Sequence, residues 1–216
     1  MIAKEGGVIL IPTFIFLIIG LSAYFFIDNS FAWIQYVNYL VIFFFLFSLY
    51  FFREPNRKIV NVSGQMLSPA DGKVVQIIEV EDSEVGPAHQ ISIFLSVFNI
   101  HSQYVPIDSK VISSEYFPGK YLMAFNHKAS DKNERTNITF EITSGEKYKV
   151  RQIAGFIARR ILNYMTPDEE VVKGNRLGFI RFGSRVDIVV PKAKFNIIVE
   201  KGDKVKANVS PIGEFV

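Results

Sequence analysis

The dipeptide Gly183-Ser184 is the part of this sequence that could most directly carry chemistry. A serine hydroxyl acts as a nucleophile once a neighbouring base takes its proton. A glycine lacks a Cβ atom, so it can adopt strained backbone angles that leave its carbonyl open to attack by the next residue's hydroxyl. The pair also lies between two strand-like runs, 177–182 and 185–190, where a glycine marks a bend or a close backbone approach. Taken alone, however, the pair is more simply an ordinary hairpin turn.

Other familiar chemistries lack their motifs in this sequence. The 216 residues include no cysteine, which excludes thiol catalysis, disulfides and thiolate metal sites. There is no Walker loop and no GxGxxG, HExxH or GxSxG motif. The histidines, at positions 89, 101 and 127, do not have the spacing of a metal site, so none is expected. The formal charge of +3 is modest and no aromatic stripe accompanies it, so we expect no nucleic-acid partner.

The elements around Gly183-Ser184 are predicted to be strands. From Leu67 onward, short runs rich in Val, Ile and Phe alternate with turn residues roughly every ten residues, which favours a mainly β fold, a barrel or sandwich. One helix is expected over Phe156–Met165. Ser144-Gly145-Glu146 is typical of a hairpin connection. The expected strands are Lys73–Glu81, Ile91–Ile100, Lys110–Phe117, Thr136–Thr143, Lys147–Ala154, Leu177–Phe182, Arg185–Val190 and Asn196–Glu200.

Residues 1–52 have a different composition from the rest of the chain. They contain only three charged side chains but 11 of the 21 phenylalanines. Two uncharged runs, about 8–27 and 31–52, would each form a helix long enough to cross a bilayer core of about 30 Å. We therefore predict a transmembrane helical hairpin over residues 1–52, turning at Asp28-Asn29-Ser30, followed by a single β-rich domain over residues 53–216.

The charges that flank the predicted hairpin indicate its orientation. Arg53, Arg57 and Lys58 follow the second helix, whereas the turn between the helices has no cation. Positively charged flanks stay in the cytoplasm, so we expect a multi-pass protein of the cytoplasmic membrane with its polar domain on the cytoplasmic side. Residues 53–216 carry a net charge of +4, which suits anionic lipid head groups.

Several segments occur in the order found in one family. They are Phe52-Arg53-Glu54-Pro55, Leu67-Ser68-Pro69-Ala70-Asp71-Gly72-Lys73-Val74, Phe98-Asn99-Ile100-His101-Ser102-Gln103-Tyr104-Val105-Pro106, Gln152-Ile153-Ala154-Gly155, Ala158-Arg159-Arg160-Ile161 and Arg181-Phe182-Gly183-Ser184-Arg185-Val186-Asp187. Each segment is weak by itself, but the ordered set is specific. The chain resembles a short-form phosphatidylserine decarboxylase proenzyme, or its archaetidylserine counterpart, over nearly all of residues 50–216.

The resemblance implies an enzyme that makes its own covalent pyruvoyl group by self-cleavage. The Ser184 hydroxyl would attack the Gly183 carbonyl, and elimination followed by hydrolysis would turn Ser184 into the pyruvoyl group. The products would be a membrane-bound chain ending at Gly183 and a 33-residue chain that remains its partner. The resemblance implies His101 as the base that activates the hydroxyl and Asp71 as the carboxylate that orients it. Outside this family context, both residues fit ordinary turn or strand positions.

The resemblance also implies the substrate, a serine phospholipid that is decarboxylated to the ethanolamine phospholipid. The pyruvoyl carbonyl would accept the electrons released as carbon dioxide leaves. Arg159 and Arg160 are candidates for binding the substrate phosphate, although a solvated pair is about as plausible. Larger family members have a second histidine where this chain has Tyr104, so the division of labour between two histidines does not carry over. Diacyl and archaeal ether lipids both remain open, as does a homo-oligomer.

Two alternatives come from other classes of protein. The run Val199–Asn208 is similar to the hairpin turn of lipoyl and biotinyl domains, with Gly202-Asp203 at its tip. A membrane-tethered carrier or binding barrel without catalysis is therefore one alternative, but a carrier needs an attachment lysine, usually beside Met, and no Met-Lys pair is present. The other alternative is a pyruvoyl decarboxylase of a soluble amino acid, which the predicted membrane hairpin disfavours.

Overall fold

The computed structural model describes residues 1–26, 33–60, 62–122, 132–155, 160–181 and 183–216. The chain divides into two compact units, Met1–Asn56 and Arg57–Val216. The first is helical and the second is built from strands, so the protein is mainly β, as the sequence predicts.

The helical unit is a pair of apolar helices. A 3₁₀ turn, η1 (Lys4–Gly6), leads into α1 (Gly7–Phe26), and α2 (Trp33–Phe51) follows. Asn38 Nδ2 donates a hydrogen bond to the Gly20 carbonyl oxygen at 3.0 Å. A Cβ atom on Gly20 would lie 2.1 Å from the Asn38 side chain, so glycine permits this contact. Small residues and polar side chains of this kind join helices in lipid.

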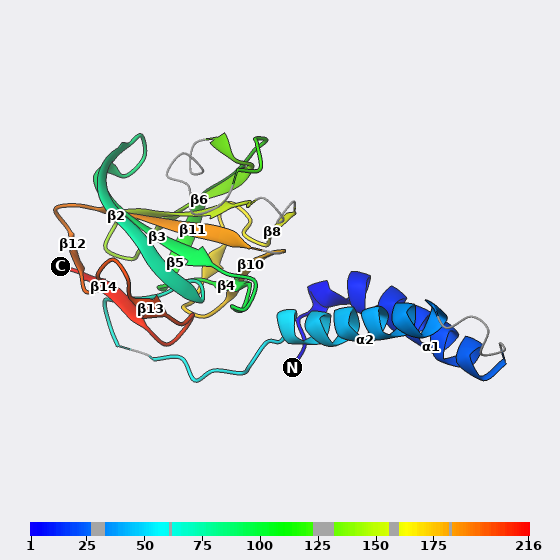
Figure 1. The fold of residues 1–216 in the computed structure, drawn as a ribbon. Coiled ribbons are helices and arrows are strands. Elements are labelled where there is room, and N and C mark those ends of the chain that lie inside the picture. Colours follow the sequence, from blue (N-terminus) through cyan, green and yellow to red (C-terminus); the bar gives the residue numbers. More distant parts are fainter. Residues whose placement is uncertain (27–32, 61, 123–131, 156–159, 182) are drawn as a thin grey trace. The chain divides into compact units, whose positions relative to one another are not determined.

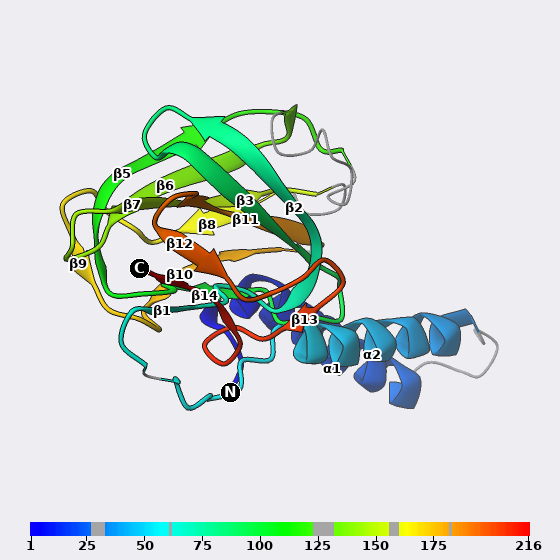
Figure 2. The ribbon, with the colours of Figure 1, turned by 90° about the vertical axis from the view of Figure 1, so that its left-hand side faces the viewer.

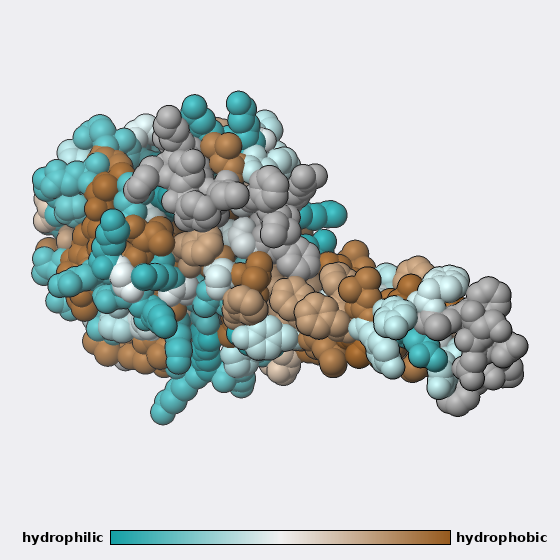
Figure 3. All heavy atoms as spheres, in the orientation of Figure 1, coloured by the Kyte–Doolittle hydropathy of each residue, from teal (hydrophilic) through white to brown (hydrophobic). Residues whose placement is uncertain are grey.

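The outer surfaces of both helices are apolar. Only 11% and 17% of the residues in their most apolar stretches are buried, and Figure 3 shows brown, hydrophobic side chains over the helical unit. In length and composition both helices could cross a membrane. Helices that are apolar all round are found in protein cores or in membranes, and these two are not buried in the protein.

The β unit contains one large antiparallel sheet and two small ones (Figures 1 and 2). Among the described residues, the large sheet has the strand order β13-β2-β3-β11-β7-β6-β5-β9, and the small sheets have the orders β1-β14-β12 and β4-β10-β8. The strands are β1 (Gln65–Leu67), β2 (Gly72–Asp82), β3 (Gly86–Leu95), β4 (Ser102–Tyr104), β5 (Ser109–Phe117), β6 (Arg135–Glu141), β7 (Lys147–Ile153), β8 (Ile161–Asn163), β9 (Glu170–Val171), β10 (Arg176–Ile180), β11 (Ser184–Pro191), β12 (Phe195–Ile197), β13 (Lys204–Val205) and β14 (Pro211–Phe215). The large sheet curls into a half-barrel.

Strand β11, which begins at Ser184, lies in the middle of the large sheet. It pairs with β3 on one side and with β7 on the other. Successive side chains point to opposite faces of a strand, so Val186, Ile188 and Val190 enter the hydrophobic core while Arg185 and Asp187 lie on the other face. Both faces are buried along this strand, which fixes its position in the sheet.

Two predictions of local structure need correction. The helix expected over Phe156–Met165 is wrong where the structure describes it, because Ile161–Asn163 form β8 and pair with β10; residues 156–159 lie outside the described residues. The strand expected over 91–100 ends at Leu95, and a turn leads from it to β4. At β8, pairing with a distant segment outweighs the local pattern. After Leu95, local hydrogen bonds between Ser96 and Asn99 form the turn that ends the strand.

The turn predicted at Gly202-Asp203 is present, and Gly202 has a positive φ of 112°. The strands that flank it, β12 and β13, nevertheless pair with β14 and β2 rather than with each other. The lipoyl-like similarity therefore extends to the turn but not to a hairpin between its two flanking strands.

Candidate active site

Gly183 and Ser184 stand at the start of the central strand, where the geometry suits the proposed nucleophile. Gly183 has a φ of +73°, in the left-handed region that favours glycine. Ser184 is fully buried and lies opposite Leu95 of β3. Its Oγ atom has no hydrogen-bond partner among the residues that the structure describes. A buried hydroxyl without a partner costs free energy, and a catalytic role is one of the reasons for which such a group is retained.

His101 is bonded directly to the backbone of this dipeptide. The Gly183 N–H donates to His101 Nε2 at 3.1 Å, and His101 Nδ1 lies 2.9 Å from the Asn99 carbonyl oxygen. An N–H can only donate and a carbonyl can only accept, so these partners indicate that Nδ1 carries the proton and Nε2 presents its lone pair. The fully buried imidazole therefore has the tautomer that a general base at Gly183-Ser184 needs.

A short turn before His101 fixes the oxygen that selects this tautomer. The Asn99 side-chain oxygen accepts hydrogen bonds from the Ser96 N–H at 2.9 Å and from the Ser96 hydroxyl at 2.7 Å. The Asn99 N–H donates back to the Ser96 carbonyl oxygen at 2.9 Å. Asn and Ser stabilise tight turns in this way, and the result is an Asn99 carbonyl aimed at the imidazole.

A chain of two glutamines is hydrogen-bonded to the backbone of His101. Gln103 Nε2 donates to the His101 carbonyl oxygen at 2.8 Å, and Gln152 Nε2 donates to Gln103 Oε1 at 3.0 Å. Neither glutamine was predicted from the sequence to have a role, although Gln152 opens one of the family segments. Gly178 of β10 leaves room for this contact, because a Cβ atom there would lie 2.4 Å from Gln152 Nε2.

Asp71, predicted to orient His101, has other hydrogen-bond partners among the described residues. The Asp71 carboxylate instead accepts hydrogen bonds from both terminal nitrogens of Arg57, the second at 2.7 Å, and from the Ala207 N–H at 2.9 Å. The Arg57 guanidinium has a raised pKa because it bonds to this carboxylate. The segments themselves are close, since the Tyr104 N–H donates to the Pro69 carbonyl oxygen at 2.9 Å. The orienting contact of His101 Nδ1 is thus the Asn99 carbonyl.

The candidate phosphate-binding residues are only partly described. Arg159 lies outside the described residues. Arg160 is exposed, and its carbonyl oxygen accepts a hydrogen bond from the Arg181 N–H at 3.3 Å. Arg181 is two residues from Gly183, so the backbone pairing places Arg160 beside the strand end that leads to the dipeptide. Tyr104, which stands where larger relatives have a histidine, has the Arg176 guanidinium 5.7 Å from its ring centre.

The comparisons with known proteins agree on one family. Residues 44–213 match the protein-family model for phosphatidylserine decarboxylase. The phosphatidylserine decarboxylase proenzyme of Chlorobium chlorochromatii (strain CaD3) is 44% identical over 187 residues, which cover 85% of this chain and 86% of that protein. The proenzyme of Syntrophus aciditrophicus (strain SB) is 42% identical over 99% of this chain and 97% of its own length.

The matched region contains every segment that forms the site. It includes Asp71, His101 and the Gly183-Ser184 dipeptide, and the similarity to the second relative extends along almost the whole chain. The comparisons lead to the same conclusion as the ordered sequence segments: this chain belongs to the phosphatidylserine decarboxylase family.

Proposed function

We propose that the chain is a membrane-anchored proenzyme that cleaves itself between Gly183 and Ser184 and then decarboxylates a serine phospholipid. Family membership supports phosphatidylserine decarboxylation. The observation that carries self-cleavage is the buried, unpartnered Ser184 hydroxyl beside a glycine whose N–H is held by His101 Nε2.

The cleavage follows from the groups present at the dipeptide. His101 Nε2 exchanges its hydrogen bond with the Gly183 N–H for the proton of the Ser184 hydroxyl, and Oγ attacks the Gly183 carbonyl carbon. The peptide bond to the Ser184 nitrogen breaks as His101 passes the hydroxyl proton to that nitrogen, and an ester to Oγ forms. Removal of the Ser184 Cα proton then expels the Gly183 carboxylate and leaves dehydroalanine. Water hydrolyses its enamine form, so ammonia leaves and the carbonyl of a pyruvoyl group remains at position 184.

The environment of Ser184 fits such a group. The side chain is buried, its oxygen has no competing partner, and the position is held in the central strand by pairing with β3. Once formed, the pyruvoyl group supplies an electron-withdrawing carbonyl for loss of carbon dioxide from the substrate. The chain's own part in turnover is then to exclude water with its buried surroundings and to return a proton to the substrate carbon from His101.

The phospholipid head group requires a cationic contact beside this position. Arg160 is exposed and joined by its backbone to the strand end that leads to Gly183, so we assign it to the phosphodiester. An arginine can donate two parallel hydrogen bonds to a phosphate. The same role for Arg159 remains a sequence-based proposal.

Anchoring is proposed from the two apolar helices. They are long enough to cross a bilayer, and Arg53, Arg57 and Lys58 follow them, which favours the cytoplasmic side for the β unit. The serine head group could then reach position 184 while its tails stay in the membrane. The carrier alternative loses its support, because the family is one of decarboxylases.

Intact-mass analysis of the purified protein tests the proposal. We expect two chains from the wild type, the larger ending at Gly183 and the smaller, of 33 residues, blocked to Edman chemistry. Ser184→Ala should remain whole because it has no attacking oxygen. His101→Ala should slow cleavage roughly 10²- to 10⁴-fold, the range for loss of a general base. A wild-type preparation that decarboxylates phosphatidylserine as one uncleaved chain would refute the self-cleavage proposal.

A further inference from the structure

The face of β11 that points away from the hydrophobic core carries a buried ion pair next to Ser184. Arg185 is 1% exposed and Asp187 is completely buried. Arg185 Nε donates to Asp187 Oδ1 at 2.6 Å. An arginine is rarely buried so completely unless its donors are satisfied, so its remaining contacts indicate what it holds in place.

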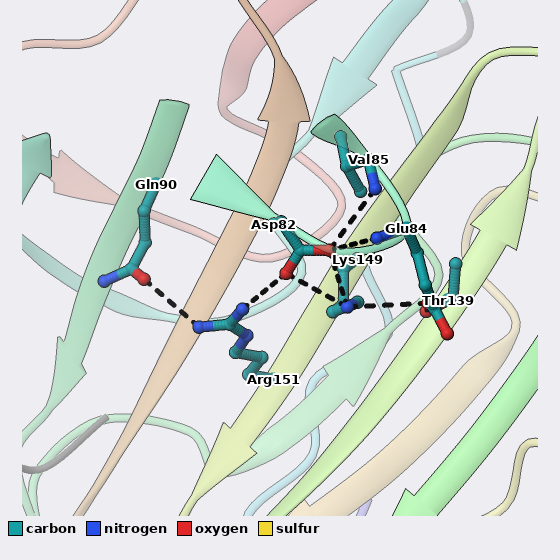
Figure 4. Close-up of polar contacts among 7 residues, drawn as sticks. All are labelled: Asp82, Glu84, Val85, Gln90, Thr139, Lys149 and Arg151. Carbon is teal, nitrogen blue, oxygen red and sulfur yellow. Dashed lines mark hydrogen bonds and ion pairs between the residues drawn. The ribbon is translucent and has the colours of Figure 1, made fainter. Parts of the chain in front are cut away.

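The contacts of Arg185 lead into a hydrogen-bonded network across the large sheet. Arg185 Nη2 donates to the Ser92 hydroxyl of β3 at 2.7 Å and to Gln76 Oε1 of β2 at 3.4 Å. Figure 4 shows the distal half of the network, where Arg151 and Lys149 of β7 converge on Asp82 of β2. We define the polar network by its continuous path, which runs through Arg185, Ser92, Gln90, Arg151, Asp82 and Lys149.

The members of the polar network are held rigidly at its far end. Lys149 Nζ lies 2.7 Å from Asp82 Oδ1, and Arg151 Nη2 lies 2.6 Å from Asp82 Oδ2. Gln90 joins this end to Ser92, because its Oε1 accepts from Arg151 at 3.4 Å and its Nε2 donates to the Ser92 hydroxyl at 3.2 Å. Ser92 Oγ therefore accepts hydrogen bonds from both Gln90 and Arg185 and links the two ends of the polar network.

Self-cleavage would change what holds position 184. In the uncleaved chain, Ser184 is restrained by its peptide bond to Gly183; afterwards it would be a chain end, and chain ends fray unless they are tied down. The sheet holds this end on one side only, since Ser184 pairs with Leu95 of β3 whereas the pairing with β7 begins at Arg185. The reactive group would thus stand at the new end of the strand, on a residue that pairs with one neighbouring strand only.

We propose that Arg185 is a positioning residue that ties the new chain end to the larger cleavage product through Ser92. The inference rests on the proposed self-cleavage, which places Arg185 and Asp187 in the 33-residue chain and the rest of the polar network in the other. The Arg185–Ser92 bond then joins the two products one residue from the pyruvoyl group. Fraying at that residue would move the reactive carbonyl away from His101 without changing the groups that bind lipid.

Hydrogen exchange followed by mass spectrometry tests this role in the full-length protein. Arg185→Lys and Ser92→Ala remove the contact with little loss of volume, and each is compared in the cleaved chain and in an uncleaved Ser184→Ala background. Val189→Ala is the matched control, because Val189 is buried on the same face of β11 but is outside the polar network. Intact mass first establishes that the cleaved samples are cleaved, so a failure of self-cleavage is recognised before exchange is measured.

The expected result is a difference that depends on cleavage. Amides 185–188 should exchange at least about tenfold faster in the two variants than in the wild type after cleavage, as expected for loss of a hydrogen bond to a charged group. In the uncleaved background, the same substitutions should change this exchange much less. The kcat for phosphatidylserine should fall while KM stays near the wild-type value. Equal acceleration in both backgrounds, or an equal effect of Val189→Ala, would show that Arg185 is only a general stabiliser of the sheet and would overturn the proposal.

Discussion

Gly183→Ala tests whether the backbone conformation at the cleavage site matters, because it changes the conformational preference of that residue without causing a steric clash. An ideal Cβ atom on Gly183 would lie 4.0 Å from its nearest neighbour, Val97 Cγ1, so alanine fits without a clash. Its φ of +73° is nevertheless a conformation that an L-residue adopts at a cost of about 1–2 kcal/mol. Such a cost lowers the population of this conformation roughly 5- to 30-fold.

The cleavage rate should fall by about the same factor if the left-handed conformation is the reactive one. The precursor would be made in a short pulse of cell-free synthesis, and its conversion into the two products would be followed on denaturing gels and by intact mass. We expect Gly183→Ala to cleave slowly but to completion. Gly183→Val should be far slower, because a β-branched residue disfavours positive φ more strongly.

A second glycine provides the control for stability. Gly86, the first residue of β3 after the turn from β2, has a φ of +79° and, among the described residues, no atom within 4 Å of an ideal Cβ. Gly86→Ala should cost a similar free energy of unfolding, measured by urea titration in the Ser184→Ala background, yet leave the cleavage rate unchanged. Cleavage of Gly183→Ala at the wild-type rate, despite an equal loss of stability, would refute a role for the left-handed conformation.

The other predictions concern support, charge and anchoring. Asp71→Asn and Arg57→Ala should slow cleavage by similar factors, because both weaken the hydrogen-bonded ion pair between Arg57 and Asp71. A much larger effect of Asp71→Asn in the same pulse assay would mean that the carboxylate acts on His101 directly. Lys149→Met should lower the free energy of unfolding by about 3–5 kcal/mol, measured by urea titration, because it leaves a buried carboxylate short of a partner. Burial raises the pKa of Asp82, but its interactions with Lys149, the backbone and Arg151 lower that pKa overall. The ionised carboxylate therefore contributes its full stabilisation above about pH 3.9, and this stabilisation is lost as the pH falls through the lower pKa of the folded state. Asp82→Asn should therefore weaken the dependence of the free energy of unfolding on pH in this acid range. A chain lacking residues 1–52 should still cleave, yet decarboxylate phosphatidylserine in vesicles much more slowly than the full chain; equal vesicle rates would contradict the anchoring role.

Much of the architecture could be predicted from local patterns. The apolar runs near 8–27 and 31–52 indicated helices because each is continuous, and the strands from 73 onward followed alternating runs bounded by turn residues. Very short strands such as β8 and β13 were missed, because two or three residues carry no periodicity of their own. Their existence depends on a partner strand that is remote in the chain.

The sequence by itself determined the family and the candidate groups, because the ordered segments around Asp71, His101 and Gly183-Ser184 can be recognised without knowing any distance between them. Only the tertiary structure decided which groups meet. In the structure, Asp71 bonds to Arg57 and Arg185 bonds to Ser92. The His101 imidazole bonds to the Asn99 carbonyl and to the Gly183 N–H. These pairings depend on strand register and on burial, which favours a nearby hydrogen-bond partner for most polar atoms. Neither quantity is encoded in the spacing of residues along the chain.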